Sequence, residues 1–472
     1  MTRGIVVLNF VDNMGRTFTL PTSLRARLAI VGSVAGLYAL GYMLYFFGSP
    51  LFGGRQRQQP IIQVIDDHLS SSLPGLVTNG TGTNDEDSSS NLPRVLLVTA
   101  FFQLSDSKPI KDKWLQHFLG QVTNDIYIFT TPNLESQILQ FRGSSNNSKI
   151  TIDTSYPTPF DIPPLKGKED AYKMMKKKDR QKSKSHTPEL FALRNSKPFF
   201  LHTALQKTQV NTSASYDYVF WNDVANFHEE HQYRAWPSPS RVREVWEEGT
   251  RITGTRTDEL MFIPMWGLPH RTFVFWNENM GPIDNDFSQG MHRPTFHRDI
   301  IDSFFYFFII TESFFGGPPK AIDWYTRTFY AYHDKYLSLG VFVGKDQATA
   351  NALLVLFPDR FITVWYNDPN APAHLQLNRA TIQESFLGQC NSERFYYQFW
   401  LADEATKAKM RDMWIQKQNR WRLWGWWRPK DRVRCQSTRA LAMKEVLRRP
   451  FGADWEPPRA SIAVPSTLSW DP

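Results

Sequence analysis

Residues 217–227, DYVFWNDVANF, contain an apolar run that leads directly into Asn222 and Asp223. A carboxylate at the end of a buried strand lies at the mouth of a sheet, where it can bind a cation or a substrate. The same aspartate could instead be the polar cap of the strand, bonded only to backbone. The role of Asp223 therefore decides whether the chain has a catalytic site here.

A second group of polar side chains follows at once. HEEH, residues 228–231, offers two histidines and two carboxylates beside Asp223, a set that a metal-dependent hydrolase could use. Its spacing is not the His-Glu-x-x-His pattern that places two histidines on one helix face. A metal-dependent hydrolase is therefore an alternative function, and this spacing makes it the weaker one.

The strand before Asp223 belongs to an alternating pattern. Continuous apolar, β-rich runs predict strands at residues 94–102, 125–130 and 149–154. Segments with helical spacing predict helices at residues 110–122, 134–143 and 188–205, the last broken by Pro198. This alternation predicts an α/β fold with a parallel sheet wound with helices.

The predicted sheet places several residues on one rim. Ligands of such sheets bind beyond the carboxyl ends of the strands. Asp223 would lie on that rim, and so would Thr99, Ala100 and Phe101 at the end of the first strand.

The N-terminal region predicts a membrane anchor. Residues 28–47 are twenty positions without a charge, and at about 1.5 Å per residue such a helix crosses the roughly 30 Å hydrocarbon layer. Arginines before this run favour a cytosolic tail at 1–27, with a cleaved signal peptide as the alternative. The polar residues 48–92 predict a disordered stem, and residues 93–472 would form a lumenal domain. Three glycosylation sequons all follow the anchor, at Asn79, Asn146 and Asn211.

The net charge of +8 has a local source. Residues 166–184 hold eight Lys and one Arg against three acidic residues, which is typical of a solvated helix or loop. No zinc-finger, RNP or helix-turn-helix signature supports a nucleic-acid partner. The two cysteines, Cys390 and Cys435, are too few for a disulfide framework or a Cys-based zinc site.

Four blocks, VTAFF, FWNDVANF, SFFGGPPKAI and GKDQATANALLVLFPDRF, occur in this order along the chain. They resemble the HtrL/YibB/WlaTC-like family of proposed glycosyltransferases, and the same body occurs in fungal type II membrane proteins. The similarity covers roughly residues 93–455. It implies a GT-A-like (Rossmann-like) mixed sheet flanked by helices. With the anchor, stem and sequons described above, we expect a Golgi or ER membrane enzyme with its catalytic domain in the lumen.

SFFGG followed by a downstream acid also resembles retaining galactosyl- and N-acetylgalactosaminyltransferases of the GT-A fold. That resemblance implies a turn against the donor sugar, formed by Phe315, Gly316 and Gly317. It also implies a reaction centre with the carboxylate of Asp346, its neighbour Gln347, and His333 facing substrate hydroxyls. The alternatives are a simple turn for the glycines, a helix N-cap for Asp346 and a core position for His333.

The chain departs from the GT-A pattern at the metal site. Such enzymes usually carry Asp-x-Asp after the fourth strand, whereas Asp223 is followed by Val224 and Ala225. One carboxylate holds Mn²⁺ or Mg²⁺ weakly unless a diphosphate and another side chain complete the shell. Second-tier ligand candidates are Asp284 and Asp286, an Asp-x-Asp without a preceding apolar strand, and His374.

These observations predict a glycosyltransferase that uses a nucleotide sugar, a UDP-sugar with Mn²⁺ or Mg²⁺, and a glycan or glycoprotein acceptor. The leaving diphosphate needs a cation or basic side chains, and the anomeric centre needs a nearby carboxylate. The missing second aspartate leaves a third alternative, a catalytically inactive sugar-binding or scaffold protein.

Residues 290–311, GMHRPTFHRDIIDSFFYFFIIT, separate flanks that run together in the proteins this chain resembles. Gly290-Met291 can be encoded with a GTATG donor site and Thr311-Glu312 with an ACAG acceptor site. The codons of SFFYFF are necessarily rich in pyrimidines. We therefore expect a translated intron here, with an apolar surface loop as the alternative.

Overall fold

The computed structural model describes residues 10–11, 17–18, 92–104, 112–143, 149–179, 186–211, 215–265, 267–284, 314–365, 368–371, 396–420, 438–468 and 470. The predicted anchor at 28–47, nearly all of the stem and the segment 290–311 lie outside these residues, as do Asp286, His374 and both cysteines. Within the described part of the chain, no helix has the length and apolar character that crossing a bilayer requires. The chain divides into two units, Met1–Thr83 and Asn84–Pro472.

The N-terminal unit contains one described feature. Strand β1 (Phe10–Val11) pairs antiparallel with β2 (Thr17–Phe18).

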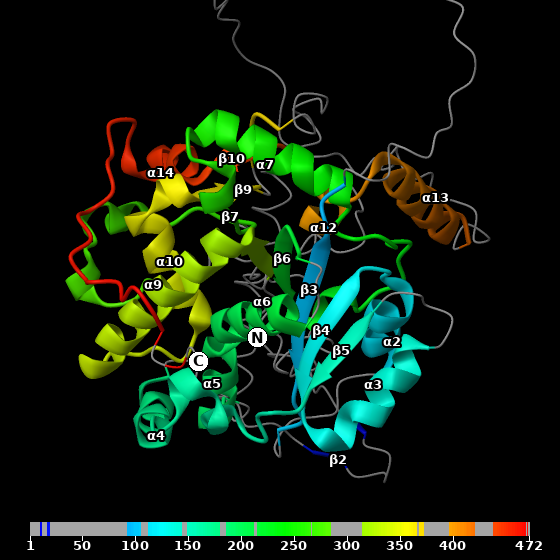
Figure 1. Ribbon diagram of the computed structural model, residues 1–472, viewed down its shortest axis with the longest axis horizontal. Coiled ribbons are helices and arrows are strands. Elements are labelled where there is room, and N and C mark those ends of the chain that lie inside the picture. The colour runs from blue at the N-terminus through cyan, green and yellow to red at the C-terminus, as the bar shows by residue number, and fades with distance from the viewer. Residues whose placement is uncertain are drawn as a thin grey trace, which may run out of the picture. The chain divides into compact units, whose positions relative to one another are not determined.

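The second unit is built on an eight-stranded mixed sheet (Figure 1). Its strands follow the order β10 (Leu441–Ala442), β9 (Phe361–Thr363), β7 (Met261–Phe262), β8 (Phe314–Gly317), β6 (Tyr218–Asn222), β3 (Val95–Phe101), β4 (Asp125–Thr130) and β5 (Ile150–Asp153). Strands β6, β3, β4 and β5 run parallel. Strand β8 is antiparallel to β6 and β7, β9 is parallel to β7, and β10 closes the edge antiparallel to β9. The predicted mixed α/β sheet is confirmed.

The helices between the parallel strands also match the predicted pattern. They are α2 (Asp112–Gln121), α3 (Glu135–Arg142), α4 (Glu169–Lys178), α5 (Pro188–Asn195) and α6 (Lys197–Asn211). The predicted break near Pro198 occurs two residues earlier, at Ser196. Proline lacks a backbone N–H, so Pro198 fits in the first turn of α6, where that donor would have no partner.

The predicted turn at the glycines of SFFGG is wrong. Gly316 and Gly317 lie inside β8 and not in a turn, with Gly316 paired to Phe220 and Gly317 to Val219. A Cβ on Gly316 would meet the Val219 carbonyl oxygen and would lie 2.7 Å from the Phe220 Cα. Glycine is needed here because β6 and β8 approach too closely for a side chain.

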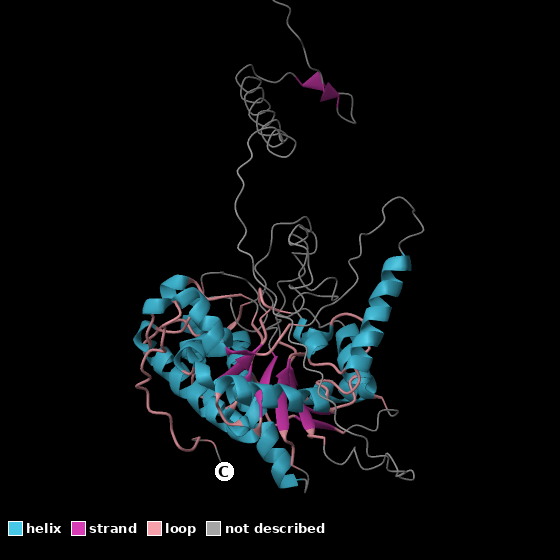
Figure 2. Ribbon diagram, turned by 90° about the horizontal axis from the view of Figure 1, so that it is seen from above, coloured by secondary structure: helices cyan, strands magenta, loops and turns pink. Residues whose placement is uncertain are grey.

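Helices cover both faces of the sheet (Figure 2). Side chains of alternate strand positions pack into two cores, one on each face. One core contains residues of α5, α6, α9 (Pro319–Ser338), α10 (Asp346–Leu356) and α14 (Met443–Phe451). The other contains residues of α2, α7 (Pro239–Thr253), α12 (Tyr396–Trp400) and α13 (Glu404–Arg420). On β3, Val98 belongs to the α6 core and Leu97 to the α2 core, as the two-residue period of a strand requires.

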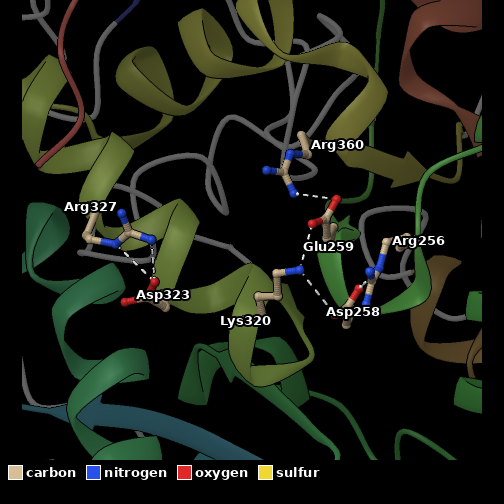
Figure 3. A network of polar contacts seen from close by, with 7 residues as sticks. All are labelled: Arg256, Asp258, Glu259, Lys320, Asp323, Arg327 and Arg360. Atoms are coloured by element: carbon tan, nitrogen blue, oxygen red, sulfur yellow. Dashed lines mark hydrogen bonds and ion pairs between the residues drawn. The ribbon is translucent and has the colours of Figure 1, made fainter. Parts of the chain in front are cut away.

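A surface network of charges fixes the start of α9 (Figure 3). Lys320 Nζ lies 2.7 Å from a Glu259 carboxylate oxygen and 3.3 Å from one of Asp258. Arg360 reaches the same Glu259 at 3.2 Å, and Arg256 pairs with Asp258 at 3.0 Å. These pairs are exposed to solvent, which screens them, so they orient the helix more than they stabilise the fold.

Candidate active site at the carboxyl ends of β3 and β6

The parallel half of the sheet has a topological switch point between β3 and β6. From β3 the chain builds β4 and β5 to one side, then crosses to form β6 on the other side of β3. Helices that leave adjacent strands in opposite directions open a crevice beyond the carboxyl ends of those strands. The residue that follows β6 at this edge is Asp223.

The Asp223 carboxylate binds side chains. One of its oxygens accepts a hydrogen bond from Trp221 Nε1 at 2.9 Å, and the other lies 3.4 Å from Lys197 Nζ. It makes no capping bond to the short helix η5 (Val224–Phe227) that follows. The alternative in which Asp223 binds only backbone is therefore wrong.

Asp346 reaches the same ammonium group from the other side. Its carboxylate lies 2.9 Å from Lys197 Nζ. Asp346 is the first residue of α10, and Lys345 occupies the N-cap position, so the alternative in which Asp346 is the N-cap is also wrong. A carboxylate in the first turn is favoured by the positive end of the helix. The two acids that the sequence singled out thus converge on one lysine.

Lys197 is the residue that the sequence analysis missed. It is the first residue of α6 and its side chain is 2 % exposed, so its charge depends on the two carboxylates around it. The available signal was a lysine that directly precedes the apolar stretch PFFL, at a helix start. Only the tertiary structure shows that this helix start meets the end of β6.

Further charges surround this centre. Lys345 Nζ lies 2.9 Å from Asp284, another of the predicted acids. Arg194, at the end of α5, is partly buried, and burial lowers its pKa against the opposing effect of Asp346, Asp179 and Asp223. Asp179 itself lies 2.7 Å from the Nδ1 atom of His186, whose pKa is lowered mainly by burial.

The described residues do not form a site for Mn²⁺ or Mg²⁺. Both oxygens of Asp223 already have hydrogen-bonding or ionic partners, and Asp284 pairs with Lys345. No three His, Cys, Asp or Glu side chains in the described part of the chain come together as a metal-binding group. The other two predicted ligands, Asp286 and His374, lie outside the described residues.

Residues on β3 divide between the two faces of the sheet. Ala100 packs against the core on the α6 side, which is the side of Lys197, whereas Phe101 packs on the α2 side. Thr99 lies between Val98 and Ala100 and is fully buried, and its hydroxyl has no hydrogen-bond partner in the described structure. Of these three predicted residues, Ala100 is the one that shares a face with the lysine.

Three other predicted residues take different positions. Gln347 is buried beside Asp346, in the first turn of α10. Phe315 pairs with Trp221 within the sheet. His333 is fully buried in α9, where Nε2 lies 2.8 Å from the Tyr172 hydroxyl and Nδ1 lies 2.7 Å from Asp334. Both ring nitrogens have protein partners, so the expectation that His333 faces substrate hydroxyls is wrong.

The HEEH segment does not form the metal site of a hydrolase. His231 is buried, and its ring nitrogens lie 3.1 Å from the His117 carbonyl oxygen and 3.2 Å from the Tyr233 backbone N–H. Burial lowers the pKa of His231 to about 3. His228 pairs instead with the neighbouring Glu229. A histidine with two backbone partners in a core is a structural group.

Comparisons with known proteins add little to this geometry. No protein-family model matches the chain, so the resemblance to the HtrL/YibB/WlaTC-like family stays a prediction, and no curated protein matches. Among solved structures, the chain is similar to core-mannan synthase A from Aspergillus fumigatus in its Mn/GDP form. The identity is 10%, the match covers 61% of this chain and 79% of the other, and the TM-score is 0.33. A likeness of that size carries no argument about function, and the case for this site rests on its own residues.

Proposed function

We propose that this protein is a glycosyltransferase that moves a sugar from a nucleotide-sugar donor to a glycan or glycoprotein acceptor. The observation that supports it is the convergence of Asp223 and Asp346 on the buried Lys197 at the switch point of the sheet. Ligands of open α/β sheets bind in this crevice. Buried, oppositely charged groups that meet there are typical of a reaction centre.

The three side chains suit the charge changes of glycosyl transfer. The bond between the anomeric carbon and the diphosphate oxygen breaks, and the electron pair leaves with the diphosphate. A new bond forms to an acceptor hydroxyl oxygen, whose proton passes to an oxygen of the departing diphosphate. We assign Asp346 to the anomeric centre, where a carboxylate stabilises developing positive charge. Asp223 and Lys197 hold Asp346 in place, and Lys197 adds positive charge on the side of the leaving group.

Ala100 and Gln347 complete the proposed donor site. Ala100 offers a small side chain at the end of β3, on the same face as Lys197. Gln347 follows Asp346 and carries an amide that can both donate and accept hydrogen bonds. Gly316 and Gly317 are left out of the proposed site because their close approach to neighbouring strands explains them.

We place the enzyme in the ER or Golgi membrane, as a single-pass type II protein with a lumenal catalytic domain. The support is the uncharged run at 28–47, the polar stem after it and the three downstream sequons. The donor is proposed to be a UDP-sugar, from the family resemblance.

The test is a thermal-shift screen of the detergent-solubilised full-length chain against a panel of nucleotide sugars. We expect one donor to raise Tm and to release its nucleoside diphosphate when acceptor glycans are added. Binding of sugars without any release would favour the inactive sugar-binding protein. A folded chain that no nucleotide sugar stabilises would refute the proposal.

A further inference from the structure

We infer that the diphosphate of the donor is bound by the protein's own basic side chains, Lys197, Arg194 and Lys345, without a divalent cation. This inference rests on the proposed function and departs from the Mn²⁺ or Mg²⁺ that the sequence predicted. It assigns binding roles to three residues that were not among the predicted site residues.

The first argument is charge balance. Asp346 and Asp223 share Lys197 at 2.9 and 3.4 Å, and Asp284 lies 2.9 Å from Lys345. Arg194 is close enough to Asp223 and Asp346 for their charges to act on its pKa. Three carboxylates thus face three basic groups. The fourth carboxylate in the cluster, Asp179, accepts from His186.

A divalent cation would bind weakly to carboxylates that already have basic partners. The ammonium of Lys197 already occupies the space between the two best carboxylates, where a metal ion would have to bind. A cation bound about 4 Å from that ammonium would be repelled by several kcal/mol at the dielectric of a protein site. It could bind only by displacing Lys197 from both acids.

The second argument is the direction of the helices. Lys197 is the first residue of α6 and Asp346 the first residue of α10, so their 2.9 Å contact brings two helix N-termini together. The positive end of the helix dipole makes such ends favourable for anions. An ammonium group at the same place strengthens that preference.

The third argument is an unused donor. The Nε atom of Arg194 is buried and makes no hydrogen bond within the described part of the chain. A buried N–H without a partner costs free energy, and a guanidinium is well suited to phosphate oxygens. A diphosphate would satisfy this group, whereas a metal ion would not.

Isothermal titration of UDP and of GDP into the full-length chain tests the inference. We expect at least one of them to bind in EDTA with a Kd within about threefold of that in Mn²⁺, since the ion is not part of the site. Binding that appears only with Mn²⁺ would overturn the inference and leave the proposed glycosyltransferase intact. Binding of neither nucleotide in either buffer would refute both.

Variants separate a binding role from a structural one. Lys197→Met should weaken nucleotide binding in EDTA at least about tenfold, because a charged hydrogen bond is lost, and Lys197→Arg should restore most of it. Lys207→Met is the matched control, since Lys207 lies on the same helix and pairs with Asp153 at 2.7 Å outside this site. It should bind as the wild type does.

Arg194→Gln keeps the inference testable if Lys197→Met does not fold. It removes a guanidinium whose Nε has no hydrogen-bond partner in the described structure, and it should weaken binding in EDTA several-fold. Unchanged binding in a folded Arg194→Gln protein, with no dependence of the Kd on ionic strength, would overturn the role of these basic groups.

Discussion

Replacing Lys197 by methionine tests the geometry of the site through stability alone. Methionine fills a similar volume but carries no charge. Asp223 and Asp346, which are 9% and 6% exposed, would then lie close together without the ammonium between them. Two buried carboxylates left unpaired repel one another and lose a counter-ion that water cannot replace.

The magnitude follows from burial. Lys197 is 2 % exposed, so the estimate for a buried ion pair applies, and removing one partner costs about 3–5 kcal/mol. Lys207, on the same helix, pairs with Asp153 of β5. The Lys207 side chain is 37% exposed, and the buried Asp153 also accepts hydrogen bonds from the Tyr127 hydroxyl and the Ser155 backbone N–H. Lys207→Met should therefore cost less than Lys197→Met, because Asp153 keeps two partners.

Thermal unfolding of the two variants beside the wild type measures the difference. We expect Tm to fall by roughly 5 °C or more for Lys197→Met and by much less for Lys207→Met. The double variant Lys197→Met with Asp346→Asn should recover part of the loss, since it removes one of the two repelling charges. Equal small shifts for both single variants, or no recovery in the double variant, would show that the three side chains do not form this buried cluster.

Three other predictions concern the fold around the site. The pKa of His231 is about 3 in the folded protein and about 6.5 in a free side chain, so between these pH values only the unfolded state binds the proton. The contribution of His231 to stability should therefore be complete above pH 6.5 and should fall as the pH drops toward 3. His231→Gln should make the free energy of unfolding, measured by urea titration at each pH, depend less on pH. Gly316→Ala should lower stability by at least about 2 kcal/mol, because its Cβ would collide with β6, and an unchanged Tm would contradict the close approach of β6 and β8. Glu278 is buried and accepts hydrogen bonds from the Tyr332 hydroxyl and the Ser461 backbone N–H. Glu278→Ala should therefore release the C-terminal segment around Ser461 and speed its limited proteolysis several-fold. Equal cleavage rates in the variant and the wild type would show that this carboxylate does not hold the C-terminal segment in place.

The parallel half of the sheet could be predicted from sequence because its strands are long, apolar and separated by helices. Residues 94–102 and 125–130 were predicted as strands, and β3 and β4 lie within them. The strands of the antiparallel half are harder to predict from sequence. Strands β7 and β10 have two residues each, and a pattern that short has no periodicity to detect. The sequence Gly-Gly-Pro-Pro is typical of a turn, but its two glycines end β8 and its second proline begins α9. Only the strands beside them explain why the glycines are extended.

In the candidate site, too, some residues could be predicted from sequence and others could not. Asp223 and Asp346 each lie beside a recognisable element, so sequence could single them out. Their meeting depends on Lys197, whose position requires the crossing of α6 over the sheet. His333 fails as a predicted site residue because residue type alone does not distinguish a core histidine from a catalytic one, and burial lowers its pKa.

The most direct test of the account compares the wild type with Asp346→Asn for release of nucleoside diphosphate from the donor that stabilises the full-length chain best. Asparagine keeps the shape of the side chain and removes the charge assigned to the anomeric centre. We predict that Asp346→Asn binds the donor within a few-fold of the wild type and loses at least about a hundredfold in release rate. Equal release rates in the two proteins, or a folded wild-type chain that releases nothing from any nucleotide sugar, would contradict the claim that this cluster is a glycosyltransferase centre.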